Sequence, residues 1–262
     1  MIETLTQEVV GKIRRGERVW LFLDYDGTLA DFAPTPEDIF PDPELIDLLG
    51  RVAQHPNIRI AIISGRRLSH IQKLLPLPGV ILAGTYGIEL QFVNQGVTSL
   101  LEYAGIRPHL DRLKTRWEKL IAGKQGFFLE DKGWALAIHA RFADDLEAGQ
   151  VLPAARNLVL EDGIPDHFRI LGGHKFLEFG PVLANKGKTV AYLLEQLPWP
   201  EALLVYVGDD DKDEEAFEVV KLKGGRAVVV SHIPRPTLAD YRLKNPQAVR
   251  RWLNSITALI TV

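Results

Sequence analysis

The sequence carries two clusters of carboxylates, each directly after a short run of apolar residues. Asp24 and Asp26 follow "VWLFL", and the run "LLVYV" leads into Asp209, Asp210 and Asp213. Buried carboxylates repel one another, and each is unfavourable in a core without a partner. Acids from two strands are the oxygen ligands of a hard divalent cation, and Mg²⁺ takes few carboxylates together with waters and phosphate oxygens. The clusters therefore predict a Mg²⁺ site, where an Asp can act as a nucleophile through an aspartyl-phosphate.

Two further groups are suited to holding phosphate oxygens. Ser64, Gly65 and Arg66 form a turn after the apolar run "IRIAII", and Lys186 precedes a predicted helix. A hydroxyl, main-chain N–H groups and an ammonium are all donors for a phosphate. Taken singly, these features have ordinary interpretations as helix caps, tight turns, a solvated acidic helix start or a surface lysine. Their order and their shared position after strands favour a phosphoryl-transfer site.

The elements that must position these residues alternate between apolar runs and helical segments. Apolar runs without polar alternation are typical of parallel strands that are covered on both faces. We predict such strands at 19–23, 58–63, 79–83, 202–208 and 226–230. The alternation with helices predicts a doubly wound α/β core, in which ligands bind at the carboxyl ends of the strands. The candidate residues follow three of these five runs or begin a helix, so we expect them to converge on one edge.

The middle of the chain has a different pattern. Leu110, Leu113 and Trp117 share one face of a predicted helix, which is followed by a hairpin that turns near residues 131–133. A helix at about 144–162 and two short strands, "FRIL" and "KFLEFG", complete a helix–hairpin–helix–hairpin block. This order predicts an α+β domain with antiparallel strands at 105–180, inserted into a discontinuous core of residues 1–104 and 181–262.

Composition and charge limit the classes of partner. The chain has 262 residues, 46% of them hydrophobic and 25% charged, with a formal net charge of −3. Without a basic footprint, we expect neither a nucleic-acid partner nor a membrane surface. The chain has no cysteine, which excludes disulfides, thiolate metal sites and cysteine nucleophiles. The N-terminal stretch lacks the apolar segment of a signal peptide, and no stretch has the length of a transmembrane span, so we expect a cytoplasmic protein.

Four motifs in this order resemble those of the haloacid dehalogenase (HAD) superfamily of phosphatases: "DYDGT", "SGR", Lys186 and "GDDDKDE". Longer stretches, "LDYDGTL", "EDKGWALAIHAR", "KFLEFGP", "NKGKTV" and "GDDDKDEEAF", are similar to the trehalose-6-phosphate phosphatase family over about residues 19–235. The resemblance implies a HAD Rossmann-like core with a parallel sheet and an inserted C2-type α+β cap. It also implies hydrolysis of a sugar phosphate, trehalose 6-phosphate, with Mg²⁺ as the cofactor. A trehalose-6-phosphate synthase is the implied functional partner.

The resemblance implies a role for each acid of the core. Asp24 would be the nucleophile and a Mg²⁺ ligand. Asp26 would be the general acid and base, with its main-chain carbonyl on the metal. Asp209 would be a further metal ligand, and Asp210 or Asp213 would be an additional ligand or an anchor for the others.

The same resemblance assigns the phosphoryl group to a second set of residues. Ser64 and Lys186 would hold its oxygens, and Gly65 would contribute its main-chain N–H. Arg66 would support this loop or reach the substrate.

The predicted cap carries polar pairs suited to binding sugar hydroxyls. Residues i and i+2 of a strand share a face, so Glu130 and Lys132 project together, as do His139 and Arg141. The resemblance points to Glu130, Lys132 and Glu178 as sugar ligands, and extends to Lys175, His139 and Arg141. The alternative for all six residues is a solvated face of a sheet.

Two departures from the family pattern, one of them a residue pair, leave the sugar open. Thr85-Tyr86 stands where the family usually has Asn-His, and Lys212 where it commonly has Thr. A phosphatase acting on glucosylglycerol phosphate or sucrose phosphate is therefore a second hypothesis. A non-catalytic sugar-phosphate-binding module and a phosphotransferase or mutase are further alternatives on the same fold.

Overall fold

The computed structural model describes residues 2–32, 39–161, 163–173 and 175–260. The chain forms two compact units: Met1–Thr98 together with Asn185–Val262, and Ser99–Ala184. The chain leaves the first unit after Thr98 and returns to it at Asn185. The sequence pattern predicts these boundaries near residues 105 and 181. The second unit includes strand β9 (Phe176–Pro181), and the first unit resumes at Asn185, which caps the next helix.

The first unit is built on one eight-stranded sheet in the order β12-β11-β10-β1-β2-β3-β4-β5. The six strands from β12 to β3 run parallel, and β4 pairs antiparallel with β3. The strands are β1 (Val19–Leu23), β2 (Ile58–Ile63), β3 (Ile81–Gly84), β4 (Glu89–Gln91), β5 (Val97–Ser99), β10 (Leu203–Gly208), β11 (Arg226–Val230) and β12 (Tyr241–Leu243). The five predicted strands are therefore present, and the short strands β4, β5 and β12 are additional.

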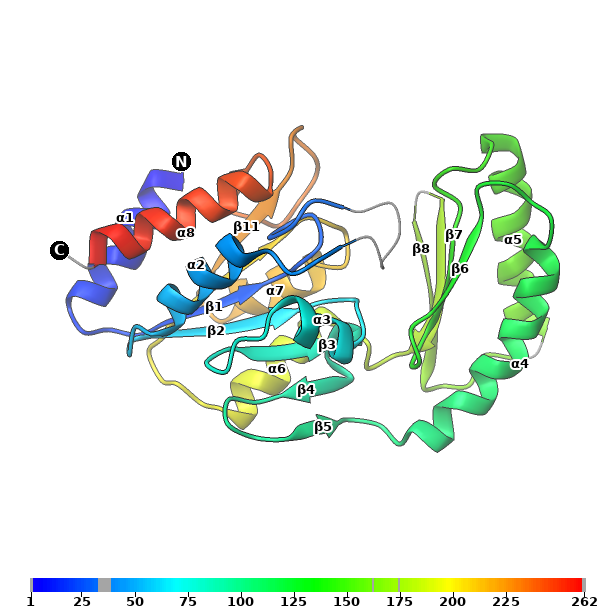
Figure 1. Ribbon diagram of the computed structural model, residues 1–262, viewed down its shortest axis with the longest axis horizontal. Helices are drawn as coiled ribbons and strands as arrows, with labels where there is room; N and C mark the ends of the chain where they lie inside the picture. Colours follow the sequence, from blue (N-terminus) through cyan, green and yellow to red (C-terminus); the bar gives the residue numbers. More distant parts are fainter. Residues whose placement is uncertain (1, 33–38, 162, 174, 261–262) are drawn as a thin grey trace. The chain divides into compact units, whose positions relative to one another are not determined.

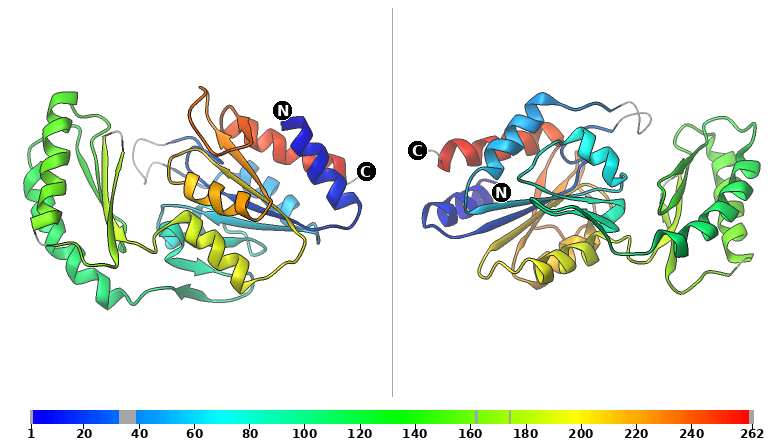
Figure 2. Two further views of the ribbon diagram at one scale, coloured as in Figure 1. Left: turned by 180° about the vertical axis from the view of Figure 1, so that it is seen from behind. Right: turned by 60° about the horizontal axis from the view of Figure 1, so that its bottom comes forward.

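Helices cover both faces of this sheet, which is why its central strands are apolar throughout (Figure 1). Val19, Leu21 and Leu23 of β1 pack in a layer with four helices. These are α1 (Ile2–Arg14), α2 (Pro43–Ala53), α3 (Leu68–Leu74) and α8 (Pro246–Ile260). Trp20 and Phe22 face the other way and stack on each other. Figure 2 shows α6 (Lys186–Gln196) and α7 (Glu214–Leu222) side by side on this second face.

Local sequence signals explain where key helices begin. Asp42 caps α2 by accepting hydrogen bonds from the N–H groups of Glu44 and Leu45, with Pro43 as the first helical residue. The Asn185 side chain accepts a hydrogen bond from the Lys188 N–H at 2.8 Å, which starts α6 at Lys186. The cap thus fixes the position of Lys186 at the first turn of the helix.

The second unit is an antiparallel four-stranded sheet with two helices. Its strand order is β6-β7-β9-β8, and α4 and α5 lie together on one face of the sheet (Figure 1). The elements are α4 (Tyr103–Ile121), β6 (Phe128–Asp131), β7 (Leu136–His139), α5 (Asp145–Glu161), β8 (Phe168–Gly173) and β9 (Phe176–Pro181). Trp117 of α4 is fully buried, and its indole N–H donates to the Ala155 carbonyl of α5 at 3.0 Å.

Strand β7 is shorter than the alternating pattern predicted. It ends at His139, and residues 141–143 form a turn and bend in which Arg141 is exposed and Phe142 is 70% exposed. Alternation along this segment would place Phe142 on the same side as Leu136 and Ile138, but the chain leaves the sheet before reaching it. None of the helices within the described ranges combines the length and the apolar character needed to cross a membrane.

Candidate active site

The candidate residues of the core meet at the carboxyl edge of the parallel sheet. Strand β1 lies between β2 and β10, with Leu23 opposite Ile62 and Val207. The residues that follow these strands, Asp24, Ser64 and Asp209, are therefore brought to the same edge. The juxtaposition follows from the parallel register, because all these strands end in the same direction.

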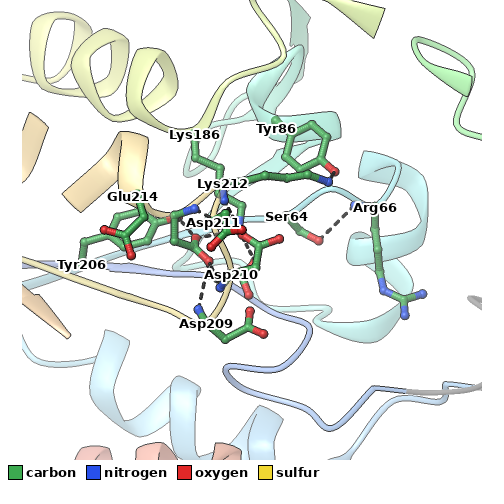
Figure 3. A network of polar contacts seen from close by, with 12 residues as sticks. Ser64, Arg66, Tyr86, Lys186, Tyr206, Asp209, Asp210, Asp211, Lys212 and Glu214 are labelled. Carbon is green, nitrogen blue, oxygen red and sulfur yellow. Dashed lines mark hydrogen bonds and ion pairs between the residues drawn. The ribbon is translucent and has the colours of Figure 1, made fainter. Parts of the chain in front are cut away.

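A buried ion pair joins Asp24 to Lys186. The Lys186 ammonium lies 2.9 Å from Asp24 Oδ1 and 2.6 Å from Asp213 Oδ1, and only 3% of the lysine is exposed. Burial alone would lower the pKa of Lys186, but the carboxylates of Asp213 and Asp24 raise it well above its usual range. Lys186 is thus a charged donor beside the Asp24 carboxylate. Figure 3 shows the lysine side chain pointing into the acidic site.

Asp213 has four hydrogen-bond donors around it and serves as an anchor. Its Oδ1 accepts from Lys186 and from the Tyr206 hydroxyl at 2.8 Å. Its Oδ2 accepts from the N–H groups of Asp209 and Asp210 at 2.9 and 3.0 Å. Both oxygens are therefore engaged in shaping the loop after β10, which favours the anchoring role over direct metal ligation. Tyr206 was not among the residues singled out from the sequence, because it lies within an apolar run.

Three carboxylates, that of Asp213 included, lie close enough together to surround a cation. One oxygen from each of Asp24, Asp209 and Asp213 lies within 4.8 Å of the others. Asp24 Oδ2 is buried and has no hydrogen-bond partner among the described residues. Burial, followed by the charges of Asp24 and Asp210, raises the pKa of Asp209 to about 10. The unpartnered Asp24 oxygen and the raised pKa of Asp209 both indicate a site for a positive charge. Mg²⁺ fits this set of oxygen donors.

Asp210 differs from Asp209 because two lysines, Lys186 and Lys212, lower its pKa. Its Oδ1 accepts from the N–H groups of Lys212 and Asp213 at 2.8 and 3.2 Å. Burial would raise the pKa of Asp210, but the charges of Lys186 and Lys212 lower it below its usual value. Asp210 is therefore ionised at neutral pH and available to a metal, directly or through water.

Asp26 is held by Arg66 in a bidentate ion pair. The guanidinium Nε and Nη2 donate to the two carboxylate oxygens, each at 2.7 Å, and Nη1 lies 3.2 Å from His70 Nδ1. The Arg66 main-chain N–H in turn donates to the Ser64 hydroxyl at 3.1 Å, and Ser64 is fully buried. The turn after β2 is thus tied to the second acid of the first cluster, a contact that spacing alone does not reveal.

Gly27 explains why a glycine follows the two acids. Its φ is +77°, and a Cβ on this residue would overlap the carboxylate of Asp209. The turn after β1 therefore lies directly against the loop after β10, and only glycine combines this backbone conformation with so close an approach.

Two side chains at the edge of the site join the turn after β3 to the loop after β10. The Lys212 ammonium donates to the Tyr86 hydroxyl at 2.6 Å and lies 4.8 Å from the centroid of its ring. Both residues belong to the departures from the family pattern noted in the sequence, Thr85-Tyr86 and Lys212. Their contact could not be foreseen from positions 126 residues apart.

Arg235 is a further residue that the sequence analysis missed. Its guanidinium donates to the carbonyls of Asp209 and Asp210 at 3.3 and 3.1 Å, and to the Asp211 carboxylate at 2.7 Å. It also forms an ion pair with Glu214 at 3.2 Å. Arg235 therefore fixes the main chain of the acidic loop. Nothing in "SHIPRPTLAD" marks this arginine as special, because the loop reaches its partners only through folding.

In the second unit, four of the predicted sugar ligands form one connected cluster. The Lys132 ammonium lies 2.7 Å from Glu178 and 3.8 Å from Glu130, and His139 Nε2 lies 2.9 Å from Glu130. Glu130 and Glu178 flank Ala137 on adjacent strands, which places them on one face of the sheet. Glu178 is 2% exposed and Lys132 is 6% exposed, so this pair is not a solvated sheet face.

The other two predicted sugar ligands, Lys175 and Arg141, lie after β8 and after β7. Lys175 contacts the Ala143 carbonyl and the Asp145 carboxylate, each at 2.6 Å. Arg141 is exposed in the turn that follows β7.

Comparisons with known proteins agree with this architecture. The sequence profile of the trehalose-phosphatase family matches residues 22–247. "Probable trehalose-phosphate phosphatase C" of Arabidopsis thaliana is 30% identical over 260 residues, which cover 95% of this chain and 80% of the relative.

Solved structures share the fold of the chain. The C-terminal domain of C. albicans trehalose-6-phosphate phosphatase superposes with a TM-score of 0.82 at 22% identity, covering 97% of both chains. A haloacid dehalogenase-like hydrolase from Bacteroides thetaiotaomicron gives a TM-score of 0.64 at 16% identity, over 92% of this chain and 100% of that one. With its parallel sheet, the buried Asp24–Lys186 pair and a family profile that spans most of its length, the chain is a phosphatase of the HAD fold and belongs to the trehalose-phosphatase family.

Proposed function

We propose that this phosphatase hydrolyses trehalose 6-phosphate to trehalose and inorganic phosphate, through an aspartyl-phosphate on Asp24 and with Mg²⁺. The observation that carries the proposal is the buried Asp24 carboxylate. One of its oxygens is held by Lys186, and the other has no hydrogen-bond partner within the described residues. Such a carboxylate is fixed in orientation and poorly solvated, which suits a nucleophile. The substrate is the one named for the family whose profile spans the chain.

In the first step, a carboxylate oxygen of Asp24 attacks phosphorus, and the bond from phosphorus to the sugar oxygen breaks. Asp26 transfers a proton to that sugar oxygen, so trehalose leaves as a neutral alcohol. The Ser64 hydroxyl, the Gly65 N–H and the Lys186 ammonium bind the phosphoryl oxygens. These donors stabilise the negative charge that gathers on the phosphoryl group in the transition state.

In the second step, Asp26 takes a proton from a water molecule as the water oxygen attacks phosphorus. The bond from phosphorus to Asp24 then breaks, which releases inorganic phosphate and restores the carboxylate. Both oxygens of Asp26 accept hydrogen bonds from Arg66 in this structure. Proton transfer at Asp26 therefore requires Arg66 to give up at least one of these contacts.

Asp24 and Asp209 are the proposed ligands of Mg²⁺, with the Asp26 carbonyl and Asp210 completing the set and Asp213 as the anchor. When bound, Mg²⁺ offsets the repulsion between these carboxylates and the phosphoryl oxygens. The raised pKa of Asp209 supports the assignment, because a carboxylate with no cation nearby stays protonated there.

The second unit, which we propose to be the cap, would recognise the sugar. Its connected cluster of Glu130, Lys132, His139 and Glu178 offers both acceptors and donors to hydroxyl groups. Lys175 and Arg141 belong to the same proposal as outer residues of the sugar site. A trehalose-6-phosphate synthase would supply the substrate, and we propose that both enzymes act in the cytoplasm.

The decisive experiment measures phosphate release from trehalose 6-phosphate, sucrose phosphate, glucosylglycerol phosphate and an aryl phosphate, with Mg²⁺ and with EDTA. We expect the highest kcat/KM with trehalose 6-phosphate, no turnover in EDTA and no turnover by Asp24→Asn. A higher kcat/KM for another glycosyl phosphate would overturn the substrate. Phosphate transferred to an added acceptor in place of water would indicate a phosphotransferase. Sugar-phosphate binding without turnover of any compound would indicate a binding module.

A further inference from the structure

The contact between Tyr86 and Lys212 lies at the turn that we assign to phosphate binding. The Thr85 N–H donates to the Arg66 carbonyl at 2.7 Å, and the Tyr86 N–H donates to the Ser64 carbonyl at 2.8 Å. The turn after β3 is therefore joined by its main chain to the Ser64–Arg66 turn. Because Lys212 contacts the Tyr86 hydroxyl, its side chain lies near the proposed phosphate donors.

Tyr86 is fixed in an uncommon conformation. Its φ of +55° lies in the left-handed region, and only 4% of the residue is exposed. Its carbonyl accepts a hydrogen bond from the Thr189 hydroxyl at 2.6 Å. Such a conformation is unfavourable for a tyrosine, and it persists where surrounding contacts over-determine it.

The Tyr86 ring covers Gly65. A Cβ on Gly65 would lie 2.7 Å from the Tyr86 hydroxyl oxygen, so the hydroxyl sits directly over this glycine. The Lys212 ammonium is 2.6 Å from the same hydroxyl oxygen. Figure 3 shows the Lys212 side chain running across the site to the hydroxyl end of the Tyr86 ring. The lysine thus brings a positive charge beside Gly65, the residue between Ser64 and Arg66.

The main chain of Lys212 is held by a hydrogen bond, as its ammonium is. Its main-chain N–H donates to Asp210 at 2.8 Å, in the loop that carries the proposed metal ligands. If Tyr86 and Lys212 served only to link the two loops, no charge would be required. A neutral donor in place of the lysine could make the same hydrogen bond to Tyr86. A cation at this place adds positive charge where the proposed substrate carries a dianion.

We propose that Lys212 is a second cationic ligand of the phosphoryl group, beside Lys186, and that Tyr86 is the residue that positions it. The inference rests on the proposed function in placing the phosphoryl group at Ser64, Gly65 and Lys186. It adds a ligand from the loop after β10 and gives a role to two of the residues that depart from the family pattern. The pair would bind the phosphoryl end of the substrate and product, independently of the sugar.

The test is binding of inorganic phosphate, measured by calorimetry with Mg²⁺ present, because it needs neither the sugar nor turnover. Lys212→Gln removes the charge but keeps a donor for Tyr86, and we expect it to weaken phosphate binding about tenfold. Lys212→Arg should recover most of this affinity. Lys223→Gln, an exposed lysine at the end of α7, is the matched control and should bind phosphate like the unaltered protein.

Tyr86→Phe tests the positioning role by removing only the hydroxyl. We expect a smaller loss of phosphate affinity, about threefold, and no further loss when the change is combined with Lys212→Gln. The melting temperature of each variant reports folding separately. An unchanged phosphate affinity in Lys212→Gln would overturn the proposal and leave the pair as a link between loops. Additive losses in the double variant would overturn the role of Tyr86.

The outcome is distinguishable from failure of the proposed function. If the protein fails to hydrolyse trehalose 6-phosphate but Lys212→Gln still weakens phosphate binding, the phosphoryl ligand stands and the sugar assignment falls. If the unaltered protein binds no phosphate, the ligand role of Lys212 is overturned whatever sugar phosphate is hydrolysed.

Discussion

At the scale of single residues, the site is dominated by carboxylates that lack sufficient positive charge. Lys186 serves both Asp24 and Asp213, yet Asp24 Oδ2 still has no hydrogen-bond partner within the described ranges. Burial also raises the pKa of Asp213 to about 7, above the usual range of an aspartate. The folded protein without metal therefore holds protons that the unfolded chain would release.

This imbalance predicts a pH dependence of stability in EDTA. The pKa of Asp209 is about 10 in the folded protein and about 3.9 in an unfolded chain. The folded state therefore binds one more proton between these values, and its stability falls as pH rises. We expect a lower melting temperature at pH 8 than at pH 5, measured by scanning calorimetry, and a smaller difference after Mg²⁺ is added.

Asp209→Asn is the matched variant for this measurement. Asparagine has no proton to lose, so the fall in stability from pH 5 to pH 8 should be smaller. Stabilisation by Mg²⁺ should also diminish, because a proposed ligand is gone. Parallel pH profiles for the two proteins would show that Asp209 does not carry the effect.

Residue types and order allowed the acids, the Ser64 turn and Lys186 to be predicted, and the structure brings them to one edge. Partners within that site could not be predicted in the same way. The Arg66–Asp26 pair and the Tyr86–Lys212 contact depend on how loops from different strands fold over one another. Sequence distance carries no information about such contacts.

At the scale of elements, the loops at the carboxyl edge depend on close main-chain approach. Gly16 and Gly27 both have a φ of +77°, but only Gly27 has a neighbour that a Cβ would meet, the Asp209 carboxylate. Gly16→Ala should cost about 1–2 kcal/mol in the free energy of unfolding and leave turnover unchanged. Gly27→Ala should add the collision with Asp209 and reduce kcat about a hundredfold or more, measured by phosphate release. Equal kcat values in the two variants would refute the close-approach argument.

Arg235 fixes the main chain of the acidic loop, which carries the proposed metal ligands. Its hydrogen bonds to the carbonyls of Asp209 and Asp210 hold the main chain from which the ligands project. We expect Arg235→Met to raise the Mg²⁺ concentration for half-maximal activity about tenfold, with a smaller change in KM at saturating Mg²⁺. Arg242→Met, an exposed arginine of β12, is the control. A change in KM alone would exclude a role in metal binding.

The long elements of the core were predictable because their patterns are continuous. Strand β1 is buried on both faces, so its five residues are all apolar, and Asn185 marks the start of α6. Strands β4, β5 and β12 have three residues each and mix polar with apolar side chains. They form because a neighbouring edge offers hydrogen bonds, which is tertiary information.

At the scale of the whole molecule, the two units divide the chemistry between them. The proposed phosphoryl site lies entirely in the first unit, and the proposed sugar cluster entirely in the second. Glu178→Gln should therefore raise KM for trehalose 6-phosphate about tenfold and leave kcat/KM for an aryl phosphate unchanged. Glu118→Gln, on the exposed side of α4, is the control, and melting temperatures report folding. Equal losses for both substrates would place Glu178 outside sugar recognition.

The second unit could be predicted because its sequence changes from continuous apolar runs to a helix–hairpin–helix–hairpin block. The buried face of α4, with Leu110, Leu113 and Trp117, could be predicted from helical spacing. Its sugar cluster was only partly predictable. Strand periodicity paired Glu130 with Lys132 and His139 with Arg141, but Arg141 lies beyond the end of β7. Where a strand stops depends on packing, and periodicity continues in the sequence after the strand has ended.

The order of the strands also has a consequence for synthesis of the protein. Strand β1 lies between β2 and β10, and β10, which ends at Gly208, is translated long after β1. A growing chain therefore exposes one apolar edge of its central strand until β10 has been translated. Asp24 also has neither Lys186 nor Asp213 beside it during that time. Non-local pairing of this kind folds slowly. The unpaired edge of β1 is therefore open to aggregation until β10 pairs with it.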